Sequence, residues 1–204
     1  MLRRFLFVLL WVIATASSAH APPQTILVLG DSLSAGYGID QTQGWVSLLD
    51  QRLQEKSLPY RVINASISGD TTGGGRARIA TALDTHQPAI VTIELGGNDG
   101  LRGLPLSEMQ KNLAAIIAQC QQRKVRVLLV GMRLPPNYGP VYTEKFQQMY
   151  AELARRYHVP LVPFLLEGVA GHPDLMQPDG VHARTAGQPI MLENVWRVLA
   201  PMLH

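Results

Sequence analysis

Three side chains in this sequence are of the types that acyl transfer to serine requires. Ser32 carries a hydroxyl, which is a poor nucleophile at neutral pH unless a base lies within hydrogen-bond reach. Histidine is the usual base, and His182 differs from the other histidines because Asp179 lies three residues before it. In a turn, that spacing lets the carboxylate reach the imidazole Nδ1, fix its tautomer and stabilise the imidazolium that forms as the serine loses its proton. The three residues predict a serine-dependent acyl hydrolase.

Hydrogen-bond donors for a tetrahedral intermediate are available at two further positions. Loss of one such donor typically raises the barrier by about 2.7–4 kcal/mol. Gly69 lets its backbone N–H approach a substrate closely, and the side-chain amide of Asn98 can donate. Glycine, asparagine and aspartate are the usual residues of turns, so each position alone is more typical of an ordinary loop. Their occurrence after successive strand candidates favours the functional interpretation.

Apolar runs alternate with helical patterns along the chain. Strands are predicted at Thr25–Leu29, Arg61–Ala65, Ala89–Glu94, Arg126–Val130 and Val159–Val162. Helices are predicted at Trp45–Glu55, Arg76–Asp84, Leu106–Gln122, Tyr142–Tyr157 and Pro189–Met202. Strands that alternate with helices of this length require right-handed crossovers and form a parallel sheet covered on both faces. We therefore predict an α/β fold: one domain, a three-layer α/β/α sandwich around a five-stranded parallel sheet in the flavodoxin-like order 2-1-3-4-5.

This fold would bring the chemical groups to one edge of the sheet. Ser32 follows the first strand, and open α/β sheets bind ligands at the carboxyl ends of their strands. The turn that contains Asp179 and His182 follows the last strand, so it reaches the same edge. We expect a buried His182–Asp179 pair, and activity that falls at acid pH as the histidine protonates.

The segment Leu106–Gln122 shows how the helices are recognised. Apolar side chains recur there at helical spacing, at Met109, Leu113, Ile116, Ile117 and Cys120. The lone cysteine is therefore expected to be a small buried hydrophobe rather than a reactive thiol. Capping-box spacing is predicted at two helix starts, by Ser107 with Gln110 and by Thr185 with Gln188.

The first residues are typical of a secretory leader. Arg3 and Arg4 precede an apolar stretch, Phe5–Ala14, and Ala19-His20-Ala21 has the small-x-small pattern of a cleavage site. The stretch is too short for a membrane span, which needs about 20 residues. We predict a signal peptide at 1–21, cleavage after Ala21, a hydrolase domain at 22–204, and export to the periplasm or beyond.

Composition and the remaining motifs exclude several function classes. Loss of Arg3 and Arg4 with the leader lowers the formal charge from +3 to +1, so the basic pI indicates no nucleic-acid partner. Ser34 stands where the second glycine of Gly-x-Ser-x-Gly would be, so the α/β-hydrolase nucleophile elbow is not matched. No cluster has zinc-ligand spacing, and we predict no metal and no organic cofactor. Nothing demands a partner chain, so we expect a monomer.

Four sequence blocks resemble those of the SGNH (GDSL-type) hydrolases, in the right order. They are Gly30-Asp31-Ser32-Leu33, Gly69, Gly97-Asn98-Asp99 and Asp179-Gly180-Val181-His182. Longer stretches around Gly69 and Asn98, and the segment Arg133-Leu134-Pro135-Pro136-Asn137-Tyr138-Gly139, are similar to the bacterial periplasmic thioesterase I/protease I/lysophospholipase group and related arylesterases. The similarity covers nearly all of the chain after the leader.

The resemblance implies a role for each matching residue. Ser32 would be the nucleophile, His182 the base and Asp179 its orienting acid. The backbone N–H groups of Ser32 and Gly69 and the side chain of Asn98 would form the oxyanion hole. By the same resemblance, Gly100–Leu104 and Arg133–Tyr138 would line an acyl-chain groove, with candidate contacts at Leu101, Leu104, Leu134, Pro135 and Tyr138.

The implied reaction is hydrolysis of esters and thioesters through an acyl-enzyme. The expected partner is a small-molecule acyl ester, thioester or lysophospholipid. A carbohydrate or cell-wall acetylesterase would use the same residues and stays open as an alternative. A non-catalytic binding module on the same sheet is disfavoured, because it would not need Ser32, Asn98 and His182 together.

Overall fold

The structure, a computed structural model, describes residues 22–203. One parallel sheet has the strand order β2-β1-β3-β4-β5, so the predicted order is confirmed. The strands are β1 (Gln24–Gly30), β2 (Tyr60–Asn64), β3 (Ile90–Glu94), β4 (Arg126–Val130) and β5 (Leu161–Val162). The predicted signal peptide and its cleavage site after Ala21 lie outside the described residues.

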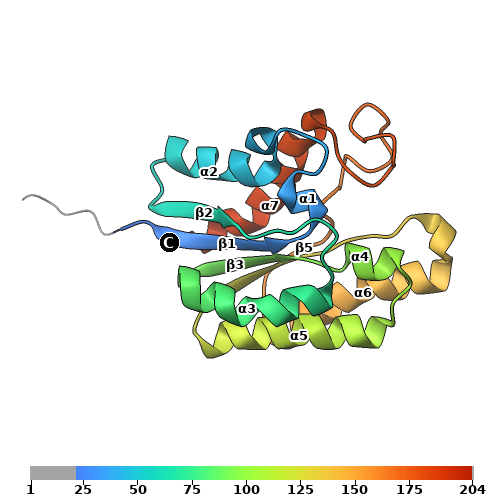
Figure 1. Ribbon diagram of the computed structural model, residues 1–204, viewed down its shortest axis with the longest axis horizontal. Coiled ribbons are helices and arrows are strands. Elements are labelled where there is room, and N and C mark those ends of the chain that lie inside the picture. The colour runs from blue at the N-terminus through green and yellow to red at the C-terminus, as the bar shows by residue number, and fades with distance from the viewer. Residues whose placement is uncertain (1–21, 204) are drawn as a thin grey trace, which may run out of the picture.

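Helices cover both faces of this sheet, which confirms the three-layer sandwich (Figure 1). On one face lie α1 (Ser32–Ala35), α2 (Trp45–Glu55) and α7 (Gln188–Leu199). On the other lie α3 (Thr72–His86), α4 (Gly97–Leu101), α5 (Leu106–Gln122) and α6 (Pro140–Tyr157). Among residues 22–203, no helix is both long and apolar enough to cross a membrane.

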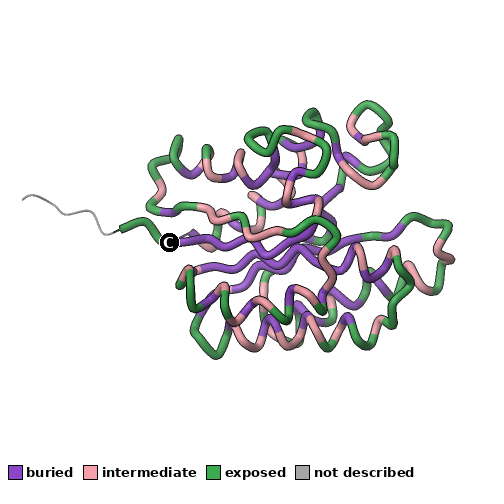
Figure 2. The backbone as a smooth tube through the Cα atoms, in the orientation of Figure 1, coloured by how far each residue is buried: buried purple, intermediate pink, exposed green. Residues whose placement is uncertain are grey.

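The sheet is the centre of the core (Figure 2). Every residue of β3 is buried, as is every residue of β1 after the first, because helices exclude water from both faces. The register sets Ile26 of β1 opposite Val62 of β2 and Ile90 of β3. All five strands run in the same direction, so the segments that leave their carboxyl ends gather at one edge.

Helix α3 begins at Thr72, four residues before the predicted start at Arg76. Three consecutive glycines at 73–75 made a helix there unfavourable by intrinsic propensity. Thr71 offsets this by capping the helix, because its hydroxyl accepts the N–H of Gly74 at 3.2 Å. At position 75 glycine is required by packing, since a Cβ would lie 2.3 Å from Leu95 Cδ1.

Both predicted capping boxes are wrong. Pro105 precedes α5 and no side chain caps it, so Ser107 lies inside the helix. Thr185 lies in a short 3-10 helix, and its hydroxyl donates to Gln43 Oε1 at 3.2 Å. Within the described part of the chain, neither α5 nor α7 has a side-chain hydrogen bond at its N-cap.

Strand β5 is shorter than predicted, because the N–H of Val159 closes helix α6 by donating to Ala154. The predicted apolar face of α5 is confirmed, with Cys120 fully buried. Burial raises the pKa of its thiol to about 12, although Arg123 opposes this effect. Cys120 is therefore a packing residue.

Candidate active site

Ser32 is the first residue of α1 and lies two residues after Gly30, the last residue of β1. Asp31 caps this short helix, since its Oδ1 accepts the N–H of Leu33 at 3.0 Å. The turn has room only for glycine at position 30, because a Cβ there would lie 2.7 Å from the Cβ of Ser34. This tight turn places Ser32 at the edge of the sheet where open α/β folds bind their ligands.

The Ser32 hydroxyl meets an imidazole from the far end of the chain. His182 Nε2 lies 2.8 Å from Ser32 Oγ, and His182 Nδ1 lies 2.7 Å from Asp179 Oδ2. The aromatic ring of Tyr37 lies against the imidazole, with ring centroids 4.5 Å apart. The fold thus brings together the three residues singled out by type and spacing.

The loop that holds Asp179 and His182 is organised by its own hydrogen bonds. Asp179 Oδ1 accepts the N–H groups of Val181 at 2.9 Å and His182 at 3.0 Å, and the His182 carbonyl accepts the N–H of Gln177 at 2.7 Å. Desolvation opposes ionisation of Asp179, but the hydrogen bonds from His182 and Val181 outweigh it and lower the pKa of Asp179 to about 2. The carboxylate therefore stays charged beside the imidazole.

This pair is less buried than expected. The side chain of His182 is 17% exposed and that of Asp179 is 41% exposed. The reason is local: the loop lies at the rim of the site, and no helix covers it. Water competes for the carboxylate, so its interaction with the imidazole is weaker than that of a fully buried pair.

Two backbone N–H groups and one side-chain amide are the candidate oxyanion donors; Ser32 and Asn98 line the cavity described below, and Gly69 is not among its lining residues. Within residues 22–203, the N–H groups of Ser32 and Gly69 donate to no other protein group. Gly69 has a φ of 81°, in the left-handed region that favours glycine. Asn98, the second residue of α4, lines the cavity described below.

A clamp holds the segments that carry Gly69 and Asn98 together. Asp99 accepts two hydrogen bonds from Thr72, one from its N–H at 2.8 Å and one from its hydroxyl at 2.6 Å. Since Asp99 follows Asn98 and Thr72 lies three residues after Gly69, the clamp joins α4 to the start of α3. Both Asp99 and Thr72 are buried.

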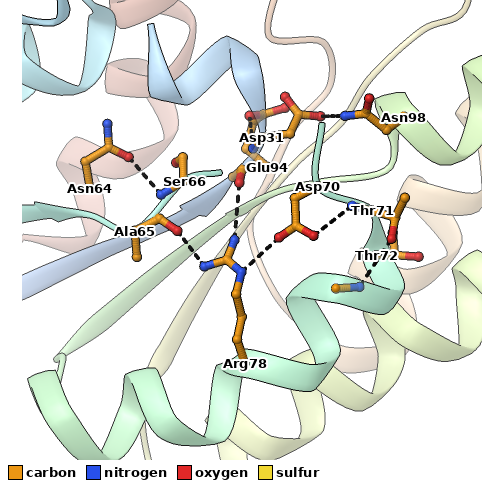
Figure 3. A network of polar contacts seen from close by, with 12 residues as sticks. Asp31, Asn64, Ala65, Ser66, Asp70, Thr71, Thr72, Arg78, Glu94 and Asn98 are labelled. Atoms are coloured by element: carbon orange, nitrogen blue, oxygen red, sulfur yellow. Dashed lines mark hydrogen bonds and ion pairs between the residues drawn. The ribbon is translucent and has the colours of Figure 1, made fainter. Parts of the chain in front are cut away.

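Arg78 ties the same region to the strand ends (Figure 3). Its guanidinium donates to Asp70 Oδ2 at 2.8 Å and to the carbonyls of Gly30, the last residue of β1, and Ala65, just after β2. Asp70 directly follows Gly69. The arginine therefore fixes the loop that carries the Gly69 N–H against β1 and β2.

Two carboxyl groups lie buried beneath Ser32. Asp31 is 2% exposed and Glu94, at the end of β3, is fully buried. Glu94 Oε2 accepts the Ser34 hydroxyl at 2.7 Å and the Asp31 N–H at 3.3 Å. Burial, together with the nearby charge of Asp31, raises the pKa of Glu94 well above its usual value. The protonated form of Glu94 is therefore favoured over the charged form.

A cavity of about 640 Å³ opens beside Ser32 and His182. Its walls include three apolar residues predicted for the groove, which are Leu101, Leu134 and Pro135. They also include apolar residues that follow β4 and β5 or lie near the histidine loop, among them Met132, Phe164, Leu166, Ala170, Met176 and Val181. A cavity of this size and lining suits an apolar ligand with its reactive group at Ser32.

Two predicted groove residues, Leu104 and Tyr138, do not line this cavity. The hydroxyl of Tyr138 donates to the Leu101 carbonyl at 3.0 Å, and Tyr142 donates to the Leu104 carbonyl at 3.0 Å. These bonds hold the two loops together, and Leu104 is left exposed at their outer side. Residues 22–203 contain no group of three or more His, Cys, Asp or Glu side chains placed to hold a metal ion.

Sequence reasoning missed Glu94, Arg78 and several apolar cavity residues after β4 and β5, which are Met132, Phe164 and Leu166. Glu94 had a signal, since a carboxyl group inside an otherwise apolar strand must be protonated or paired. Met132, Phe164 and Leu166 also had one, because apolar residues just past strand ends lie at the ligand-binding edge. Arg78 had none, because two of its three partners are backbone carbonyls and the third, Asp70, lies eight residues away in a loop.

A parallel α/β sheet with serine, histidine and aspartate meeting at its carboxyl edge defines a serine hydrolase. A model of the GDSL-like lipase/acylhydrolase family matches residues 28–190. The chain belongs to this family, as its four sequence blocks indicated, and it is an ester hydrolase.

Individual relatives are similar in sequence over almost the whole chain. The chain is 52% identical over 184 residues to esterase TesA of Pseudomonas aeruginosa, covering 90% of this chain and 92% of that protein. It is 40% identical over 200 residues to thioesterase 1/protease 1/lysophospholipase L1 of Escherichia coli K12, and the match covers 98% of this chain and 92% of that protein. A crystal structure of TesA matches with a TM-score of 0.87 and 52% identity, covering 88% of this chain and all of that one.

Proposed function

We propose that this protein hydrolyses carboxylic esters and thioesters through an acyl-enzyme formed on Ser32. The observation that carries the proposal is the continuous chain of short contacts from Ser32 Oγ to His182 to Asp179, at 2.8 and 2.7 Å. An ordinary loop has no need for such a chain, and a serine hydroxyl requires it to become a nucleophile.

In the first half-reaction, His182 Nε2 takes the proton of Ser32 as the hydroxyl oxygen attacks the acyl carbonyl carbon. Asp179 holds Nδ1 protonated and stabilises the imidazolium. The negative charge that develops on the carbonyl oxygen is stabilised by the N–H groups of Ser32 and Gly69 and by the Asn98 amide. The imidazolium then gives its proton to the leaving alcohol or thiol as the bond to the acyl carbon breaks.

In the second half-reaction, water replaces the leaving group. His182 takes a proton from the water, whose oxygen attacks the acyl-Ser32 carbonyl. The same three donors stabilise the second tetrahedral intermediate. Its collapse releases the carboxylic acid, and the proton on His182 returns to Ser32.

The apolar walls of the cavity favour an acyl chain as the part of the substrate bound there. The names of two relatives, an esterase and a thioesterase/lysophospholipase, support both oxygen and sulfur leaving groups. Candidate contacts are Leu101, Leu134 and Pro135, which line the cavity, whereas Leu104 and Tyr138 do not line it.

Labelling with a fluorophosphonate tests the nucleophile directly. We expect stoichiometric labelling of the native protein, and complete loss of labelling and turnover in Ser32→Ala with the fold unchanged by circular dichroism. Substantial turnover by a folded Ser32→Ala protein would overturn the proposal. A non-catalytic binding module would give no labelling at all.

Acyl length separates the proposed substrate class from the acetylesterase alternative. On a series of p-nitrophenyl esters from acetate to palmitate, we expect kcat/KM to rise beyond the acetyl ester, because longer chains bury more apolar surface in the cavity. An acetylesterase would be fastest with acetate and would lose rate with every added methylene.

We also propose that the chain is exported and acts as a monomer. The leader pattern at 1–21 supports export, and nothing in the site calls for a second subunit. Amino-terminal sequencing of the secreted or periplasmic protein should begin at Pro22, and light scattering should give a single-chain mass.

A further inference from the structure

The carboxyl group of Asp31 has no part in the reaction described above, although it lies directly beside Ser32. It is 2% exposed, and burying an ionisable group is unfavourable unless it is fully hydrogen-bonded. Capping α1 does not by itself explain an aspartate here, because serine or asparagine would cap equally well. A second hydrogen-bond partner of the Asp31 carboxyl group is therefore needed to explain why the residue is aspartate.

That partner is the Asn98 side chain (Figure 3). Asp31 Oδ2 accepts a hydrogen bond from Asn98 Nδ2 at 3.0 Å, while Oδ1 accepts the Leu33 N–H. Each carboxylate oxygen thus has a separate donor. One comes from the helix that begins with Ser32 and the other from the α4 residue proposed for the oxyanion hole.

An asparagine side chain can present either its oxygen or its nitrogen in a given direction, and its amide carries two hydrogens. An ionised carboxylate only accepts hydrogen bonds, so it pairs with the nitrogen and excludes the flipped amide. With one hydrogen on Asp31, the second hydrogen of the same nitrogen remains available at the cavity wall.

Of this buried pair, Asp31 is the better placed to carry a charge, because both of its carboxyl oxygens accept hydrogen bonds, whereas Glu94 Oε1 accepts none from residues 22–203. Burial raises the pKa of Asp31 to about 6, while hydrogen bonds from Leu33 and Asn98 act in the opposite direction. Burial and the nearby charge of Asp31 raise the pKa of Glu94, so a charge on Asp31 disfavours a second charge on Glu94. At pH 7 and above, Asn98 therefore faces a carboxylate.

We propose that Asp31 is a positioning residue: its carboxylate holds the Asn98 amide so that the second N–H points at the substrate oxyanion. The inference rests on the proposed function, since it assigns Asp31 an effect that acts only through Asn98. It adds a role for the aspartate that precedes the nucleophile, beyond capping.

A double-mutant cycle tests this inference. Serine at position 31 can still cap α1 but is too short to reach Asn98. We expect Asp31→Ser to lower kcat about 10–100-fold with little change in KM, because the lost interaction matters most in the transition state. In an Asn98→Ala background, Asp31→Ser should lower kcat by less than about 3-fold, since Asp31 then has no amide to position.

Asp40 provides a matched control. It caps the 3-10 helix Gln41–Gln43 by accepting the Thr42 N–H at 2.9 Å, as Asp31 does for Leu33, but it is exposed and outside the site. Asp40→Ser should leave kcat and KM unchanged. If Asp31→Ser does not fold, Asp31→Asn is used, because asparagine keeps one acceptor oxygen and the shape of the side chain.

The outcomes separate this inference from the proposed function. An equal fall in kcat in both backgrounds would mean that Asp31 acts on Ser32 or on the fold, and would overturn the inference. An unchanged kcat in the Asp31 variant would overturn it as well. Neither result would affect the nucleophile assignment, which depends on Ser32→Ala and on fluorophosphonate labelling.

Discussion

Asn98 is the donor whose contribution can be measured with least disturbance, because its side chain can be removed without touching the backbone. Asn98→Ala should lower kcat about 10²–10³-fold with little change in KM, as for other oxyanion donors. Steady-state kinetics on one ester and one thioester check this. A rise in KM with kcat unchanged would instead make Asn98 a residue that binds the ground state.

Glu94 offers a test of stability against pH. Its pKa is raised in the folded state, so the folded protein keeps a proton that the unfolded chain releases, and stability falls as pH rises above the unfolded value. Glu94→Gln carries no such proton. We expect the variant to be less stable by about 1–3 kcal/mol at pH 5, because its amide hydrogens lack a partner. This difference in the free energy of unfolding between the native protein and Glu94→Gln should narrow as pH rises to 8.

Urea unfolding at pH 5, 6.5 and 8 measures this difference. Glu108→Gln is the control, since Glu108 is exposed and pairs only with Lys111 at 2.7 Å on the helix surface. Its difference from the native protein should not narrow with pH. A stability difference between Glu94→Gln and the native protein that stays constant from pH 5 to 8 would show that Glu94 is already ionised in the folded state.

Among the elements, the junction of α3 and α4 determines where two of the proposed oxyanion donors lie. Thr72→Val removes the hydroxyl that donates to Asp99 at 2.6 Å and leaves a buried carboxylate short of one partner. We expect a loss of about 1–3 kcal/mol in the free energy of unfolding. A fall in kcat should accompany it, because Asn98 directly precedes Asp99.

Thr143→Val is the matched control. The Thr143 hydroxyl bonds only to the Gly139 and Pro140 carbonyls at the start of its own helix. Its loss should cost about 1 kcal/mol or less and leave kcat unchanged. A Thr72 variant that loses stability but keeps full kcat would show that the clamp serves the fold alone.

At the level of helices, strands and loops, the sequence predicts the sheet well and the loops poorly. Apolar runs such as Ile90–Glu94 indicate buried strands wherever they occur, because both faces of a parallel sheet must be apolar. The start of α3 could not be predicted, because the glycine at position 75 is explained by packing against a residue distant in sequence. A Cβ at this position would lie too close to the Leu95 side chain. Which loop residues face the cavity depends on contacts between the loops, such as the hydrogen bond from the Tyr138 hydroxyl to the Leu101 carbonyl.

The proposed catalytic constellation of Ser32, His182 and Asp179 could be predicted for a different reason. Asp179 and His182 are close in sequence, so their contact depends on one turn rather than on the whole fold. Their meeting with Ser32 required only that the strand ends share an edge. The buried pair of Asp31 and Glu94 depends on packing between β1 and β3, for which the sequence carries no local pattern.

For the whole molecule, Cys120 reports global unfolding. It is fully buried on α5, and burial raises its pKa to about 12. A thiol reagent at pH 8 should therefore react with the native protein only as fast as the chain opens, and within seconds to minutes in denaturant. Rapid labelling of the native protein would mean that α5 separates locally from the sheet.

The loop that supplies both Asp179 and His182 has a consequence for how such enzymes can vary. The proposed general base and the carboxylate that would orient it are the last and first residues of one four-residue segment, and they share hydrogen bonds within that loop. Exchange of this short segment between related genes would transfer a complete acid–base unit. An inserted residue between the two would break that unit, whereas insertions in the surface loops between Ser32 and Asp179 need not alter it.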